Sequence, residues 1–150
     1  MTSLRLEIEG DDEGAPVLPL PAAELLGFCS FAFALRFGAQ HELSLVAQRL
    51  KERYGVDLRV FTTYAEGVVR EQADSDDLER AWQDPGRLAE NAGKALQAIR
   101  SGDEKLAGWL AEWPEFSESL EELALRAHWA AERARRVRLV FFLDEGERPG

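Results

Sequence analysis

The stretch that decides the fold is RVRLVFFLDE, residues 136–145. Its middle is a nearly continuous apolar run, which predicts a strand that is buried on both faces and therefore central in a sheet. Near the other end of the chain, Leu4, Leu6 and Ile8 alternate with charged residues, which predicts a strand with one buried face. We expect these two terminal strands to lie side by side.

Most of the chain between these strands is predicted to be helical, because apolar residues recur at intervals of three and four. The expected helices cover residues 41–54, a short segment that carries Trp82, residues 85–100, a segment around Leu106 to Trp113, and about 117–135. Gly55 and Gly102 follow two of them as stop signals. For the short helix we expect a capping box formed by Asp76 and Glu79.

Two segments have ambiguous patterns. VDLRVFTT, residues 56–63, is rich in β-branched and aromatic residues and predicts a second strand, which residues 64–67 could turn into a hairpin with residues 68–71. Residues 21–37 favour one long buried helix by propensity, but Phe31, Phe33, Leu35 and Phe37 alternate as they would in a strand. We favour the helix.

These elements together predict an α+β or α/β fold. A small sheet of three or four strands is covered by several helices, and the C-terminal half is mainly helical and ends in the central strand. Hydrophobic residues make up 45% of the chain, which is enough for a core, and we expect residues 1–150 to form a single globular domain.

The side chains that most often carry catalysis or bind metals are scarce, because the chain has one cysteine and two histidines. Cys29 lies in the most apolar segment and is expected to be buried and unreactive. His41-Glu42 begins like a zinc-hydrolase helix, but Leu45 stands where the second histidine is needed. His128 is expected on the flank of the last helix. We therefore expect no enzyme, no cofactor and no metal site.

An acidic cluster before Pro85 resembles part of a calcium-binding loop. Asp74, Asp76 and Asp77 have suitable spacing, but such a loop needs glycine and glutamate where the chain has Glu79 and Pro85. Helix capping explains the cluster better. The glycine spacing also fits no phosphate-binding or dinucleotide-binding loop.

The net charge of −10 disfavours binding to nucleic acid or to an anionic membrane. The charge is uneven, however, since residues 126–138 hold five arginines and one glutamate. Arginine side chains suit carboxylate or phosphate ligands, yet basic residues at a helix C-terminus also complement its dipole. We favour this second interpretation.

The last helix carries the candidate interaction residues. Its core-facing stripe is expected to comprise Leu120, Leu123, Ala124, Ala127, Ala131 and Ala134. On the opposite side this leaves an apolar pair, Leu125 and Trp129, among charged residues. That pair either anchors an interface with a partner or is covered by another element of the same chain, and we slightly favour the second possibility. The candidate residues are Leu125, Arg126, Trp129, Arg133 and Arg136.

The functional expectation is a small, acidic, soluble bacterial protein that binds another protein or a second copy of itself, as an adaptor, inhibitor, immunity-like or regulatory module. Its partner is expected to be neither nucleic acid nor a membrane. The first residues lack a basic start followed by an apolar core, and a lone cysteine forms no internal disulfide, so we expect the cytoplasm. The alternatives are an enzyme with a carboxylate or arginine site, and an acidic mimic of nucleic acid.

Overall fold

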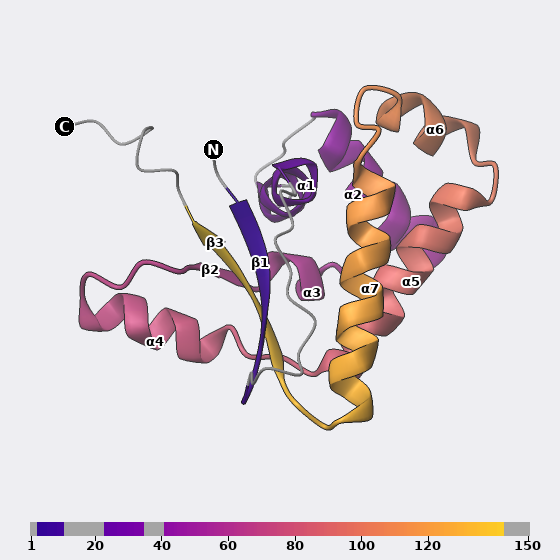
Figure 1. Cartoon of the computed structure of the whole chain (residues 1–150). Coiled ribbons are helices and arrows are strands. Elements are labelled where there is room, and N and C mark those ends of the chain that lie inside the picture. The colour runs from indigo at the N-terminus through magenta and orange to yellow at the C-terminus, as the bar shows by residue number, and fades with distance from the viewer. Residues whose placement is uncertain (1–2, 11–22, 35–40, 143–150) are drawn as a thin grey trace.

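The computed structural model describes residues 3–10, 23–34 and 41–142, and it has an α+β fold in which these residues form seven helices and a small sheet (Figure 1). The strands are β1 (Ser3–Ile8), β2 (Tyr64–Glu66) and β3 (Val137–Phe142). The helices are α1 (Ala23–Ala34), α2 (Glu42–Tyr54), α3 (Arg59–Thr62), α4 (Gln72–Arg80), α5 (Pro85–Arg100), α6 (Glu104–Leu110) and α7 (Phe116–Glu132).

The strand order is β1-β3-β2, so the C-terminal strand is central, as its apolar run predicts. β1 pairs antiparallel with β3, and Leu6 lies opposite Leu139, which confirms that the two terminal strands are neighbours. Leu4, Leu6 and Ile8 are all buried, because the alternation of β1 places them on one face of the sheet.

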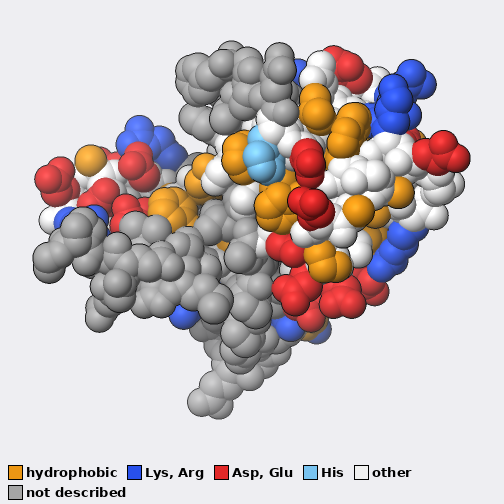
Figure 2. All heavy atoms as spheres, turned by 90° about the horizontal axis from the view of Figure 1, so that it is seen from above, with side chains coloured by type: hydrophobic (Ala, Val, Ile, Leu, Met, Phe, Trp, Pro, Cys, Tyr) orange, Lys and Arg blue, Asp and Glu red, His pale blue; other side chains and the backbone are white. Residues whose placement is uncertain are grey.

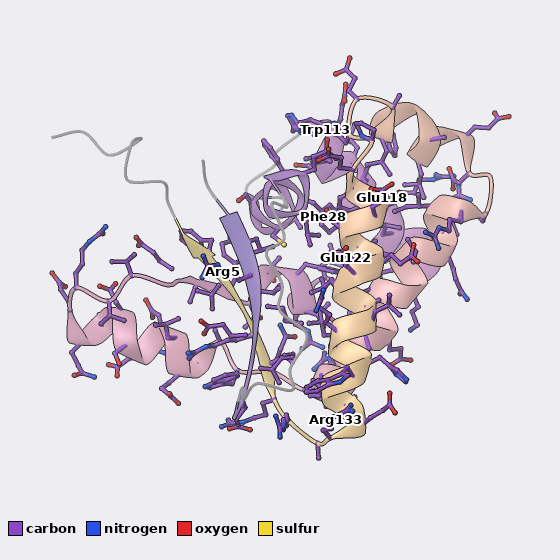
Figure 3. The ribbon with its side chains drawn as sticks, viewed as in Figure 1. Arg5, Phe28, Trp113, Glu118, Glu122 and Arg133 are labelled. Atoms are coloured by element: carbon purple, nitrogen blue, oxygen red, sulfur yellow. The ribbon has the colours of Figure 1, made fainter. Side chains whose placement is uncertain are left out.

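The main core lies between this face of the sheet and the helices. The side chain of Phe28 on α1 lies on the side of this helix that faces α7 (Figure 3). The centroid of its ring is 4.9 Å from that of Phe116 and 5.4 Å from that of Phe61. Cys29 beside it is fully buried, as expected. The helical interpretation of this segment is confirmed for Ala23–Ala34, whereas residues 21, 22 and 35–37 lie outside the described residues.

The helices α2 and α5 follow the sequence pattern closely. His41 is the N-cap of α2, where its Nδ1 accepts a hydrogen bond of 3.1 Å from the backbone N–H of Leu43. Gly55 ends the helix with φ +67°, a left-handed conformation that glycine adopts most readily. Asp84 and Pro85 begin α5, as their residue types predict.

The predicted strand over residues 56–63 is wrong. Asp57 Oδ1 accepts the backbone N–H of Arg59 at 3.0 Å, and this bond stabilises a helical turn that continues as α3. Within that turn Val60 and Phe61 are both buried in the core. Burial of adjacent side chains therefore overrides the strand propensity of the segment.

The predicted hairpin is also wrong, because β2 pairs with β3 and not with residues 68–71. The pairing is parallel, and the N–H of Gly67 donates to the carbonyl oxygen of Phe141 at 2.8 Å. The chain then enters α4, which packs on the sheet face opposite the main core. Leu78 and Ala81 form a small cluster there with Ala65 and Val140.

The helix α4 begins earlier than the sequence pattern predicts. Glu71 and Asp74 form its capping box, in place of Asp76 and Glu79, because Asp74 Oδ2 accepts the backbone N–H groups of Arg70 and Glu71, each at 3.0 Å. The helix ends at Arg80, so Trp82 lies beyond it and not within a helix.

The predicted core-facing stripe of α7 is confirmed at its centre and wrong at its end. Leu120, Leu123 and Ala127 are fully buried. Ala130 is buried in place of Ala131, and Ala134 is exposed beyond the helix. The helix stops at Glu132, earlier than the expected Arg135, because the chain turns there toward β3.

Candidate interaction surface

The arginines after α7 are positioned by a tight turn. Ala134 has φ +55°, and the N–H of Arg135 donates to the carbonyl oxygen of Ala130 at 3.0 Å. This six-to-one bond around a left-handed residue is the common way in which a helix ends. The turn leads directly into β3, so side chains from the helix end and from the strand gather at one corner.

Trp129 is covered by two of these arginines. The guanidinium carbon of Arg133 lies 3.9 Å from the centre of the Trp129 ring, and that of Arg135 lies 5.8 Å away. Arg133 Nη1 also donates to the backbone oxygen of Trp129 at 3.0 Å. The indole is half-buried and packs against the main core, so Arg133 forms the outer layer of this stack.

A second stack lies on the sheet side of the corner. The guanidinium carbon of Arg138 lies 4.1 Å from the centre of the Trp82 ring, and that of Arg136 lies 5.6 Å away. The backbone of Gln83 pairs with Val137, which brings Trp82 beside the start of β3. We call the residues of the two stacks, Trp82, Trp129, Arg133, Arg135, Arg136 and Arg138, the Arg/Trp surface.

Two arginines of this surface are held by carboxylates of β1 and of the residue that follows it. Arg136 Nε donates to Glu9 Oε2 at 3.0 Å, and Arg138 Nε donates to Glu7 Oε1 at 2.8 Å. The hydrogen bond from Arg136 lowers the pKa of Glu9, and the same bond raises the pKa of Arg136. The positive charge is therefore partly balanced from within the chain.

Arg133 differs from these two arginines. Its side chain is exposed at the lower end of α7 in the view of Figure 3, and no carboxylate of the described residues lies within ion-pair distance of it. Its planar face is held over Trp129, and such fixed guanidinium groups lose little conformational entropy when they bind a carboxylate.

The expected apolar pair on α7 divides into two different environments. Leu125 is 62% exposed, whereas Trp129, one turn later, packs against the core and is covered by arginine. Arg126 is partly buried, and its Nη1 is enclosed without a hydrogen-bond partner among the residues that the structure describes. Of the five candidate residues, Leu125, Arg133 and Arg136 are therefore exposed, and the Trp129 ring supports the Arg133 guanidinium.

One part of this corner was missed by the sequence interpretation. A cleft of about 340 Å³ adjoins Trp82, and its walls include Arg59 and Arg87. Both arginines are bound to Asp57, and the bond from Arg59, the stronger of the two influences, lowers the pKa of that carboxyl well below its usual range. These residues are distant in sequence, so no local motif marks the cleft.

The cysteine and the second histidine considered above lie in settings that serve the fold. Burial raises the pKa of the Cys29 thiol to about 12. His128 is exposed on α7, and its Nε2 lies 3.2 Å from Glu132. Within residues 3–10, 23–34 and 41–142, no three His, Cys, Asp or Glu side chains gather in a way that could hold a metal ion. Among the helices of the same residues, none has the length and apolar character needed to cross a bilayer.

Comparison with known proteins gives no relative. No family model matches the chain, and neither a curated protein nor a solved structure is significantly similar to it. Inference about function therefore rests on the residues of this chain.

Proposed function

We propose that this chain is a protein-binding module, an adaptor, inhibitor, immunity-like or regulatory protein, that binds through α7 and the adjoining Arg/Trp surface. The observation that carries the proposal is the 62% exposure of Leu125 on α7, together with the exposed guanidinium of Arg133 that is stacked on Trp129 at the end of this helix. A leucine beside ordered arginines is typical of an interface, where an apolar contact is surrounded by polar groups.

The chemistry of this surface favours an acidic protein as the partner. Arg133 is exposed and held over the Trp129 ring, and Arg136 and Arg138 extend the positive charge along the start of β3. A carboxylate of the partner could bind Arg133 bidentately, and Leu125 would supply the apolar contact. The chain has 15 arginines and 3 lysines, and with its single cysteine this composition supports placing the protein in the cytoplasm of a bacterium.

The proposal is tested by affinity capture from the native host, followed by titration of the recovered partner, and by sedimentation for self-association. We expect Leu125→Ser together with Arg133→Glu to weaken binding about thirtyfold or more, the effect of losing about 2 kcal/mol at a hot spot. The binding should also weaken as salt rises, because exposed charge pairs are screened.

A matched control is available on another part of the surface. Val69 is 53% exposed, and Arg53 is an exposed residue near the end of α2. Val69→Ser with Arg53→Glu makes the same change in charge and a similar loss of exposed apolar side chain, and it should leave the affinity unchanged. A partner that binds both double variants equally well, or neither, would contradict the assignment of this surface.

A further inference from the structure

The strand β2 has one paired edge and one open edge. Gly67 donates to Phe141 of β3, and the register places Ala65 opposite Val140. In a parallel ladder, alternate residues turn their backbone groups toward the same neighbour. The N–H and C=O groups of Tyr64 and Glu66 therefore point away from β3. In the part of the chain that the structure describes, no further strand pairs with them.

A cleft of about 480 Å³ lies along this open edge, between β2 and α4. All three residues of β2 line it, and α4 contributes Asp74, Asp77 and Arg80 from the opposite wall. The rings of Tyr64 and Phe141, 5.7 Å apart, add an apolar part. α4 is fixed in place by the packing of Leu78 and Ala81 on the sheet, so the wall is part of the fold.

The cleft lies in an acidic part of the chain. Residues 66–80 hold six carboxylates and two arginines, and Figure 2 shows acidic side chains along the arm at the left that α4 forms. Glu66 lies on this edge with its side chain 26% exposed, and its Oε1 is 3.5 Å from Arg70 Nη1.

We propose that this cleft binds an extended basic peptide segment of another protein, which adds to the sheet as a strand beside β2. Its backbone would pair with the open N–H and C=O groups of Tyr64 and Glu66. Its Lys or Arg side chains would face Asp77 on the α4 side of the sheet and Glu66 on the other side, since successive side chains of a strand point to opposite sides. A second copy of this chain does not fit, because its own β2 edge would bring the same carboxylates to the contact.

The site is distinct in place and in charge from the Arg/Trp surface. That surface carries arginines and suits an acidic partner, whereas the cleft beside β2 suits a basic one. The two proposals therefore succeed or fail separately, and Leu125→Ser should not change peptide binding at β2.

The probe is a synthetic peptide of about eight residues, the length of an ordinary strand, in which pairs of Lys alternate with pairs of Val so that both faces carry Lys. Fluorescence anisotropy of the labelled peptide gives the affinity, and amide chemical shifts of Tyr64, Glu66 and Gly67 give the location. Glu66→Gln with Asp77→Asn should weaken binding about tenfold, which corresponds to about 1.4 kcal/mol.

The control variant is Glu112→Gln with Glu118→Gln, which removes the same charge from exposed positions between α6 and α7 and on α7 (Figure 3). We expect it to bind the peptide as the native chain does. We also expect a peptide with alternate amides N-methylated on its pairing edge to lose binding, and one with Glu in place of Lys not to bind. Absence of binding by the Lys/Val peptide, equal losses in the two double variants, or equal affinity of the N-methylated peptide would each overturn the proposal.

Discussion

Arg49 Nε lies 2.9 Å from Asp103 Oδ2, and this pair joins α2 to the start of α6. The hydroxyl of Tyr54 donates to the same oxygen at 2.5 Å. Asp103 is also the N-cap of α6, where Oδ1 accepts the backbone N–H groups of Lys105 and Leu106 at 3.0 and 3.1 Å. One carboxylate, whose side chain is 5% exposed, therefore holds the end of one helix and the beginning of another.

The first prediction concerns the pH dependence that this carboxylate gives to the fold. The Tyr54 hydroxyl above all, and then the Leu106 N–H and Arg49, hold the pKa of Asp103 well below its usual range. As pH falls, the unfolded chain takes up the proton first, so the contribution of Asp103 is complete above about pH 5 and is lost progressively below about pH 4. Asp103→Asn should reduce stability at neutral pH, and the deficit should shrink in acid.

Urea unfolding of the native chain and of the variant, at neutral pH and in steps down to acid, measures this difference. Asp76→Asn on α4 is the control, since Asp76 is exposed and accepts from Gln72 on the same helix. Asp76→Asn should change the free energy of unfolding little at any pH. A deficit of Asp103→Asn that is the same at neutral pH and in acid would show that the carboxylate acts without this shift.

The second prediction is that replacing glycine by alanine changes the free energy of unfolding in opposite directions at two positions. Gly55 has φ +67°, so Gly55→Ala should reduce the free energy of unfolding by about 1 kcal/mol through backbone strain. Gly93 lies inside α5, and an added Cβ would meet nothing within 4 Å, so Gly93→Ala should raise the free energy of unfolding by about 0.5 to 1 kcal/mol. Thermal and urea unfolding measure both, and a loss at both positions would contradict the α5 assignment.

The fold could be predicted from the sequence where a single pattern covers a whole element. The alternation in β1, the apolar run in β3 and the helical spacing in α2 and α5 all gave the right element. β2 could not be found in this way, because it has three residues and exists through its pairing with β3. α3 was mistaken for a strand because the local bond from Arg59 to Asp57 outweighs the propensity of its residues.

The candidate surface shows the same division. The run of arginines after α7 is visible in the sequence, but the place of Trp82 among them is not. Trp82 meets Arg138 because the backbone of Gln83 pairs with Val137, a contact between distant segments that no local pattern contains. The difference between Leu125 and Trp129 also depends on a tertiary contact, since the two residues lie one turn apart on α7.

The third prediction concerns Cys29. The thiol is fully buried beside Phe28, and burial raises its pKa to about 12, so almost no thiolate exists at neutral pH. A disulfide reagent should therefore label the folded chain slowly and the urea-unfolded chain at once. The ratio of the two rates measures protection, and rapid labelling of the folded chain would show that α1 opens easily or that the thiol is accessible.

The last prediction separates the two residues that the sequence pairs on α7. Trp129→Ala removes a half-buried ring that packs on the core and supports Arg133, so we expect it to lower the free energy of unfolding by about 2 kcal/mol, less than the 3 to 5 kcal/mol typical of a fully buried tryptophan. Leu125→Ala removes an exposed side chain, so it should change stability by no more than about 0.5 kcal/mol. Urea unfolding measures both variants. Equal destabilisation would mean that both residues are covered within the chain, and no destabilisation by Trp129→Ala would make the indole itself available to a partner.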